Sequence, residues 1–253
     1  YTYHTYFADD IGTPGTTMTF FDFPQTSRGS KGTNAITRTS FRVPSDAALD
    51  YYAQRLDTFS VKHEVVTTVF GTKVLRFWDF DQQAYQLISD EENHGVAAGT
   101  PWKKGPVPLE FAIYGLGPVE ITVSYFADFK GLLENVFGFQ TIAQEANQAL
   151  LSVGEGGNGG QIVLIEDATS PQAQQGDGEV HHVAFRLADR ASLAVWQEVF
   201  DNLGLSNSGY VDRYYFESLY VRIGHILFEL ATDEPGFMGD EPYETLGEKL
   251  SLA

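Results

Sequence analysis

Two adjacent histidines stand where a strand is expected to begin, in the stretch GEVHHVAFRL (178–187). The whole chain of 253 residues has six histidines and no cysteine. Disulfides, thiolate catalysis and sulfur-ligated metal sites are therefore excluded, and any bound metal ion must have nitrogen and oxygen ligands. Histidine side chains at this place would suit either metal ligation or proton transfer.

Side-chain alternation separates the two histidines and indicates a partner for one of them. The apolar residues of VHHVAFRL share one face of the expected strand, so His182 points to the other face, whereas strict alternation sends His181 to the apolar side. The later segment HILFELATD alternates in the same way and places Glu229 opposite its apolar row. If both strands belong to one curved sheet, His182 and Glu229 meet in its concavity as a ligand pair that suits Fe(II), Mn(II) or Zn(II).

A second interpretation of the same two residues needs no metal. A histidine at the start of a strand often makes a structural hydrogen bond, and a glutamate within a strand often faces solvent. The alternation pattern by itself leaves both interpretations open.

The strands that would carry these residues belong to a unit that recurs along the chain. Segments 36–56 and 180–200 align without a gap around a shared F-R-[VL] core. In both segments an alternating strand is followed by a helix whose apolar residues have i, i+3 and i+4 spacing. The expected helix N-caps are Ser45 or Asp46 in the earlier copy and Asp189 in the later one.

The repeat predicts an α+β fold built from four βαβββ units that form curved mixed sheets. A third, more divergent copy covers 117–167, and its Gly-rich GEGGNGG is typical of a hairpin turn because it lacks the lysine and the context of a phosphate-binding loop. The first 24 residues offer only a hairpin, which corresponds to the last two strands of a unit. The first unit is therefore incomplete in this sequence.

The units group into two expected domains, an N-terminal one over 1–108 and a C-terminal one over 109–253. The first domain holds the incomplete first unit and the second unit, and the second domain holds the other two units and a C-terminal tail. The expected ranges of the second, third and fourth units are 35–92, 115–167 and 178–235, with linkers at 24–34 and 93–108.

The alignment of the repeats also bears on the ligand pair. Arg38 of the second unit aligns with His182, and Gln86 aligns with Glu229. Only the last unit therefore offers a metal-ligating pair.

The composition limits the partners of the protein. With 43% hydrophobic and 14% aromatic residues the chain can bury a substantial core, and its formal charge of −18 argues against nucleic-acid binding. No segment approaches the roughly 18 apolar residues of a membrane span, and the first residues lack the pattern of a signal peptide. We expect a globular, cytoplasmic protein without a membrane partner, and a homo-oligomer is compatible with the sequence.

Several separated motifs resemble a known family. Repeated βαβββ units with a histidine on the first strand and a glutamate on the last resemble the vicinal oxygen chelate superfamily, which includes glyoxalase I, fosfomycin-resistance proteins and extradiol dioxygenases. Within it, GEVHHVAFRLAD, GYVDRYYFESLYVRIGHILFELATDEPGF, DEPYETLGEKL and the early YHTYFADDIGTPGTTMTFFDFP resemble the ring-cleaving hydroquinone dioxygenases. The resemblance implies a metal-dependent dioxygenase that inserts O₂ into small hydroquinone- or catechol-type aromatics. Fe(II) is the expected metal, with Mn(II) or Zn(II) as alternatives.

The resemblance also implies roles for residues of this chain. The metal ligands of the family match His182 and Glu229, the pair that alternation selects. Residues that line the family's substrate pocket match His181, Arg213 and Tyr220. The resemblance therefore implies that these three residues have catalytic roles at the pocket.

Strand alternation supports a pocket role for Tyr220 but not for all three of these residues. Tyr220 lies on the polar face of an alternating strand, which agrees with a pocket role. A pocket role of His181 requires an irregular strand start or a position beside the metal ligands. His181 could equally form a structural hydrogen bond. Arg213 could equally form a surface ion pair with Asp212 or Glu217.

One metal ligand of the family has no match. In the family the first ligand is a histidine on the opening strand of the first unit, and no remaining histidine stands at an equivalent place: these are His4, His63, His94 and His225. His4 lies in the YHxYF motif of a later strand, where we expect it to be structural or near the pocket. Either a strand upstream of Tyr1 carries the third ligand, which we expect, or the ligand has been lost.

Two other functions are compatible with the same fold. A glyoxalase-like metal-dependent lyase or transferase would use a similar ligand pair without consuming O₂. A non-catalytic quinone- or drug-binding protein would keep the fold without a metal.

Overall fold

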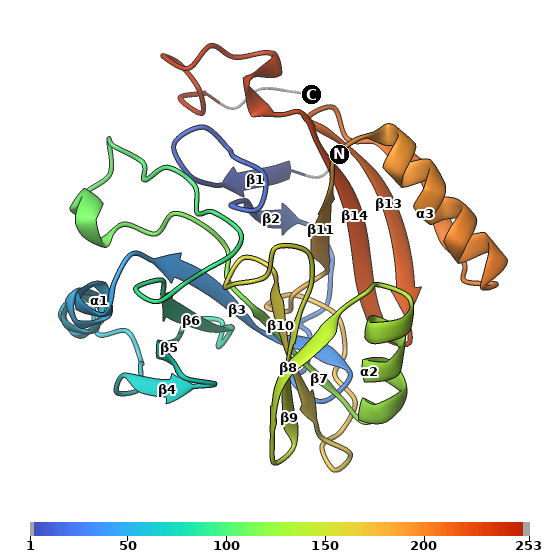
Figure 1. Ribbon diagram of the computed structural model, residues 1–253. Coiled ribbons are helices and arrows are strands. Elements are labelled where there is room, and N and C mark those ends of the chain that lie inside the picture. Colours follow the sequence, from blue (N-terminus) through green and yellow to red (C-terminus); the bar gives the residue numbers. More distant parts are fainter. Residues whose placement is uncertain (1–2, 250–253) are drawn as a thin grey trace.

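Three complete βαβββ units and one isolated hairpin make up the computed structural model, which describes residues 3–249 (Figure 1). The hairpin consists of β1 (Tyr3–Phe7) and β2 (Met18–Asp22). The mixed α+β class and the repeated units agree with the prediction from the sequence. Within residues 3–249, no helix is long and apolar enough to cross a membrane.

The elements of each complete unit follow one another in the predicted order. The second unit comprises β3 (Ala35–Val43), α1 (Asp46–Thr58), β4 (Thr67–Val69), β5 (Thr72–Trp78) and β6 (Ala84–Ser89). The third comprises β7 (Val119–Val123), α2 (Phe126–Asn135), β8 (Gln140–Glu145), β9 (Gln148–Ser152) and β10 (Gln161–Glu166). The fourth comprises β11 (Val183–Leu187), α3 (Arg190–Asn202), β12 (Asn207–Asp212), β13 (Phe216–Ile223) and β14 (Ile226–Pro235). Two short 3-10 helices, η1 (Leu109–Phe111) and η2 (Phe237–Gly239), lie outside the units.

Helices α1 and α3 begin where the sequence predicts. Ser45 caps α1, since its hydroxyl accepts a hydrogen bond from the backbone N–H of Ala48, and Asp46 is the first helical residue. Asp189 caps α3 by accepting from the N–H of Ser192 at 2.8 Å. These side chains satisfy N–H groups that have no partner within the helix.

The strands form one large sheet, one smaller sheet and the hairpin. The second and third units share an eight-stranded sheet of order β4-β5-β6-β3-β7-β10-β9-β8, and the fourth unit forms a four-stranded sheet of order β11-β14-β13-β12. In every complete unit the first strand pairs in parallel with the last. Strand β3 pairs with β7 across the expected domain boundary at 108 and 109. The division into two domains stays a prediction.

An aromatic core fixes the four-stranded sheet against the third unit. Phe228 on β14 is fully buried and its ring centroid lies 6.1 Å from that of Phe129 and 5.4 Å from that of Phe137 on the third unit. Burial of such a ring stabilises the fold by ~2–3 kcal/mol. Because Phe228 precedes Glu229 and points to the opposite face, this core holds Glu229 on the concave side of the sheet.

The segments expected as linkers pack closely against other loops. Isolated bridges join 28–33 to 172–177, and a Cβ at Gly32 would lie 2.1 Å from the carbonyl oxygen of Pro171. The Gly-rich stretch is the turn between β9 and β10, as predicted, and a Cβ at Gly157 would lie 2.0 Å from the carbonyl oxygen of His94. Glycine at these two positions therefore allows backbones to approach each other.

Candidate active site

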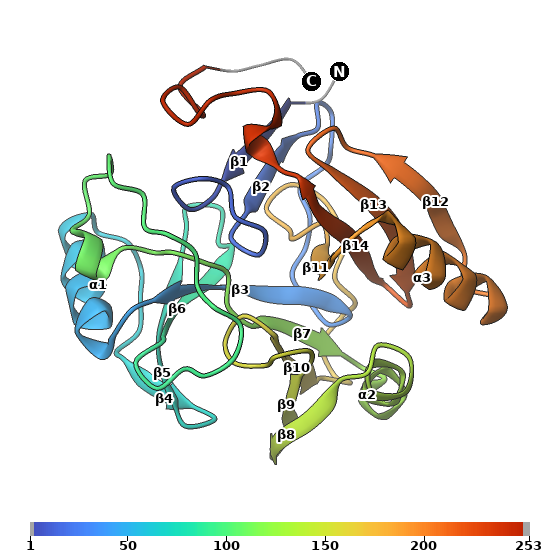
Figure 2. The same ribbon diagram turned by 45° about the horizontal axis from the view of Figure 1, so that its top comes forward.

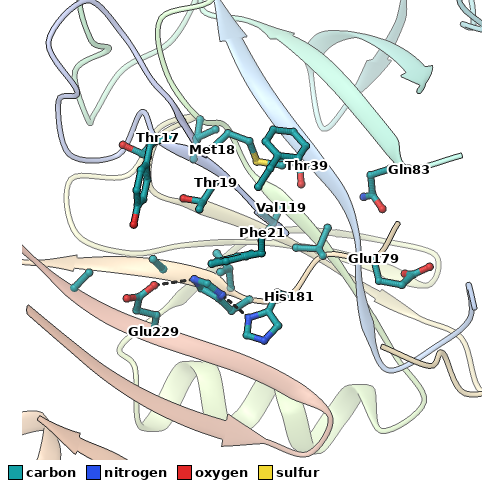
Figure 3. Close-up of a pocket in the computed structure, with 18 of the residues that line it drawn as sticks. Thr17, Met18, Thr19, Phe21, Thr39, Gln83, Val119, Glu179, His181 and Glu229 are labelled. Atoms are coloured by element: carbon teal, nitrogen blue, oxygen red, sulfur yellow. Dashed lines mark hydrogen bonds and ion pairs between the residues drawn. The ribbon is translucent and has the colours of Figure 1, made fainter. Parts of the chain in front are cut away.

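The polar side chains of the fourth unit converge on the concave face of its sheet. Strand β14 is flanked by β11 and β13, so Glu229 lies between Ala184 and Tyr220 in the strand register. His182 directly precedes β11, and its Nε2 lies 2.8 Å from Oε2 of Glu229 (Figure 3). The structure thus brings together the two residues that alternation selects.

Glu229 is buried and held in place by three neighbours. Its side chain is 4% exposed, and Oε1 accepts hydrogen bonds from the hydroxyls of Ser218 at 2.5 Å and Tyr220 at 2.7 Å. Burial alone would raise the pKa of Glu229, but the hydrogen bond and charge of His182 and the two hydroxyl donors outweigh it and lower the pKa. Oε1 is thus occupied by hydroxyls, while Oε2 faces His182.

His181 lines the cavity, and the strict alternation rule is wrong for this residue. Strand β11 begins only at Val183, so the regular two-residue period does not extend back to His181. Its Nδ1 lies 2.8 Å from Nδ1 of His182, and its ring contacts those of Phe21 and Phe23. Burial and then the charges of His182 and Arg222 lower the pKa of His181.

Arg213 and Tyr220 form a pair beside Glu229. The Nε of Arg213 donates to the hydroxyl of Tyr220 at 3.1 Å, and the guanidinium carbon lies 5.1 Å from the ring centroid. Burial and then the charge of Glu229 raise the pKa of Tyr220 to about 12. Glu217, one of the two alternative partners of Arg213, pairs with Arg190 instead. All five predicted site residues therefore lie in one connected cluster.

A cavity of about 850 Å³ lies in front of this cluster. The four-stranded sheet supplies one wall, with His181, His182 and Glu229, and the β1–β2 hairpin supplies another, with Tyr6 and Phe21. Figure 2 shows the hairpin beside β11 and β14 and above the second unit. The second unit contributes further lining residues, among them Thr39, Gln83 and Tyr85.

The hairpin wall was missed by the sequence reasoning. Alternation within YHTYF and MTFFD would have sorted its residues, because the strand register places Tyr6 opposite Thr19 and His4 opposite Phe21 on one face. The expectation for His4 fits this placement, since its ring packs against Phe21 at 4.6 Å and lies near the cavity. What the sequence does not reveal is that this face packs toward the fourth unit.

The donor atoms present fit part of a metal site. Among the described residues, no group of three or more histidine, aspartate or glutamate side chains is arranged to hold a metal ion. His182 and Glu229 supply one imidazole nitrogen and one carboxylate oxygen, the donor types that Fe(II), Mn(II) and Zn(II) share. The buried carboxylate also favours a cation at this point. The pair fits such an ion and needs at least one further ligand.

The other sheet has an ion-pair network at the equivalent position. Gln86 lies opposite Ser40 in the register of β6 and β3, as Glu229 lies opposite Ala184. Arg38 donates to Glu120 at 2.9 Å, and Gln86 donates to the hydroxyl of Ser40 at 2.8 Å. Side chains thus fill the place that a metal ion would take.

Comparisons with known proteins agree with this architecture. No family model matches the sequence. The chain is 42% identical over 256 residues to MhqA, a candidate ring-cleaving dioxygenase of Bacillus subtilis. This alignment covers 99% of the chain and 80% of MhqA. It is 31% identical over 258 residues to the chlorohydroquinone/hydroquinone 1,2-dioxygenase of Sphingobium indicum. That alignment covers 99% of the chain and 78% of the relative.

Two solved structures have the same fold as this chain. A crystal structure of a candidate dioxygenase from Bacillus subtilis superposes with a TM-score of 0.89 and 34% identity, over 100% of this chain and 79% of that one. Glyoxalase I from Zea mays shares the fold at a TM-score of 0.58 and 13% identity, over 87% of this chain and 74% of that one. From these similarities and the recurring βαβββ units, the chain belongs to the ring-cleaving dioxygenases of the vicinal oxygen chelate fold.

Proposed function

We propose that the chain uses Fe(II) to insert O₂ into a hydroquinone- or catechol-type aromatic, in an extradiol-type reaction. The observation that carries the proposal is the 2.8 Å approach of His182 Nε2 to Glu229 Oε2 at the wall of an aromatic-lined cavity. The name of the Sphingobium indicum relative supports a hydroquinone substrate. Mn(II) and Zn(II) are the alternative metals for this donor set.

His182 and Glu229 would hold the metal, and a third ligand would complete the site. In the eight-stranded sheet, β3 lies between β6 and β7. By the same repeat, a strand between β2 and β11 would pair with β11 and lie next to His182, with Glu229 one strand further on. We expect the third ligand on such a strand.

The remaining residues would position the ligands and the substrate. When bound, the metal would supply Lewis acidity toward a substrate oxygen and would activate O₂. If Nε2 of His182 held the metal, the ring proton would be on Nδ1, which lies 2.8 Å from Nδ1 of His181 and would donate to it. Ser218 and Tyr220 keep Oε1 of Glu229 in one orientation.

His181, Tyr220 and Arg213 are the proposed catalytic residues around the substrate. His181 and Tyr220 are the candidates for proton transfer at a substrate oxygen, since His181 lines the cavity and the Tyr220 hydroxyl donates to Glu229, which also lines it. The Arg213 guanidinium next to Tyr220 would stabilise negative charge that develops on the substrate. A cytoplasmic location and a homo-oligomer stay predictions.

Oxygen uptake tests the proposal. The full-length protein is loaded with Fe(II) without oxygen and then given O₂ and methylhydroquinone, and we expect uptake that His182→Ala abolishes. His63→Ala is the matched control, because His63 pairs with Asp57 outside the cavity. Full uptake by His182→Ala would rule out the ligand assignment, and no uptake by the wild type would favour a lyase or a binding protein.

A further inference from the structure

The cavity-facing side of the β1–β2 hairpin has a polar residue, Tyr6, that no part of the proposed mechanism uses. The register of the hairpin puts His4, Tyr6, Thr19 and Phe21 on one face. Tyr3 and Phe7 lie on the other face and are 60% and 62% exposed. Tyr6, Thr19 and Phe21 line the cavity in front of the ligand pair.

Phe21 locates this face relative to the metal-ligand pair. Its ring centroid lies 5.5 Å from that of His181, 5.8 Å from that of His182 and 4.6 Å from that of His4. An aromatic ring that binds at His182 and Glu229 would therefore have Phe21 beside it. Tyr6 follows His4 on the same face, one step further along β1.

The hydroxyl of Tyr6 is placed to bind a ligand. The ring is fixed by Phe237 at 4.9 Å and Tyr215 at 6.2 Å. Among the described residues, the hydroxyl has one hydrogen-bond contact, a long one of 3.4 Å to Nδ1 of His4. Burial and then the charge of Glu229 raise the pKa of Tyr6, so the group is a neutral donor at neutral pH.

We propose that Tyr6 donates a hydrogen bond to the second oxygen of a dihydroxy aromatic substrate whose first oxygen lies at the His182–Glu229 pair. This inference rests on the proposed function and names a residue that determines its substrate class. Tyr220 and Arg213 are engaged with Glu229 and with each other, so Tyr6 offers a hydroxyl on a different wall of the cavity. A monophenol has no second oxygen and would leave the partly buried Tyr6 hydroxyl without this partner.

Anaerobic binding tests the inference independently of turnover. Dissociation constants for hydroquinone and for phenol are measured on the Fe(II)-loaded full-length protein as wild type, Tyr6→Phe and Tyr3→Phe. We expect Tyr6→Phe to weaken hydroquinone binding about fivefold, which corresponds to ~1 kcal/mol, and to leave phenol binding unchanged. Tyr3→Phe removes a hydroxyl from the outer face of the same strand and should change neither.

Each outcome has a defined meaning. Tyr6 has no role in substrate choice if the wild type does not prefer hydroquinone, if Tyr6→Phe keeps the preference, or if it weakens both ligands equally. The proposed function fails separately, when the wild type binds hydroquinone selectively but consumes no O₂. Unfolding midpoints of both variants verify that the fold is intact.

Discussion

Substitution of Ser218 by alanine tests how Glu229, the proposed carboxylate ligand, is positioned. Ser218 is fully buried, and its hydroxyl lies 2.5 Å from Oε1 of Glu229. A hydrogen bond to a charged group contributes about 1.5–3 kcal/mol. Among residues 3–249, its loss leaves the Tyr220 hydroxyl as the remaining hydroxyl donor to Oε1. Since partners of metal ligands typically contribute 10- to 100-fold to metal affinity, we expect Ser218→Ala to weaken Fe(II) binding by about that factor.

Ser40 provides the matched control for this substitution. It is also fully buried, and its hydroxyl accepts from Gln86, the residue that the repeat aligns with Glu229. Ser40→Ala should lower the free energy of unfolding by about 1–3 kcal/mol and leave Fe(II) affinity unchanged. Affinity is measured by chelator competition and stability by urea unfolding of the metal-free protein. Equal Fe(II) affinity in wild type and Ser218→Ala would refute the reasoning.

Three further predictions concern the scaffold around the site. Arg38→Met should lower the free energy of unfolding by about 3 kcal/mol in urea, because it leaves the buried Glu120 with one guanidinium instead of two. Gly157→Ala should cost ~3 kcal/mol because its φ is +69° and the new Cβ meets a backbone carbonyl, whereas Gly154→Ala, at φ +61° in open space, should cost ~1 kcal/mol; equal costs would argue against the close approach. Burial would raise the pKa of Asp9, but its hydrogen bonds, chiefly from Thr13 and Thr100, outweigh burial and lower the pKa from its ordinary value of 3.8. The ionised Asp9 carboxylate therefore stabilises the fold above pH 3.8, and this contribution is lost as the pH falls through the native pKa. The stability difference between wild type and Asp9→Asn should therefore shrink in acid, and a difference independent of pH would contradict this.

The sequence predicted the units and the face of the ligand pair because both depend on local periodicity. Glu229 lies within a regular strand, and one buried neighbour, Phe228, is enough to set which way it points. His182 lies one residue before its strand, where the period still holds. His181 lies one residue further from the strand, where the two-residue alternation no longer holds.

The substrate-side wall could not be predicted because it depends on packing between units. Nothing local in the hairpin indicates that Phe21 contacts the ring of His182, more than 150 residues away in the chain. The partner of Arg213 was equally undetermined, since the competing carboxylate of Glu217 is taken by Arg190 on helix α3. Such choices are settled by which neighbours a side chain meets after folding.

Each of the two larger sheets has a buried carboxylate, and the two carboxylates have different neighbours. Glu120 is 5% exposed and Glu229 is 3% exposed, and a buried carboxylate needs a counter-charge. Arg38 and Arg76 supply permanent cations to Glu120, and their side chains fill the space. Glu229 instead faces the imidazole of His182. In the proposed metal-bound form that imidazole would be neutral, so the bound cation would balance the charge of the carboxylate. The repeat thus places guanidinium groups beside Glu120, whereas in the proposed function Glu229 would be available to a metal ion.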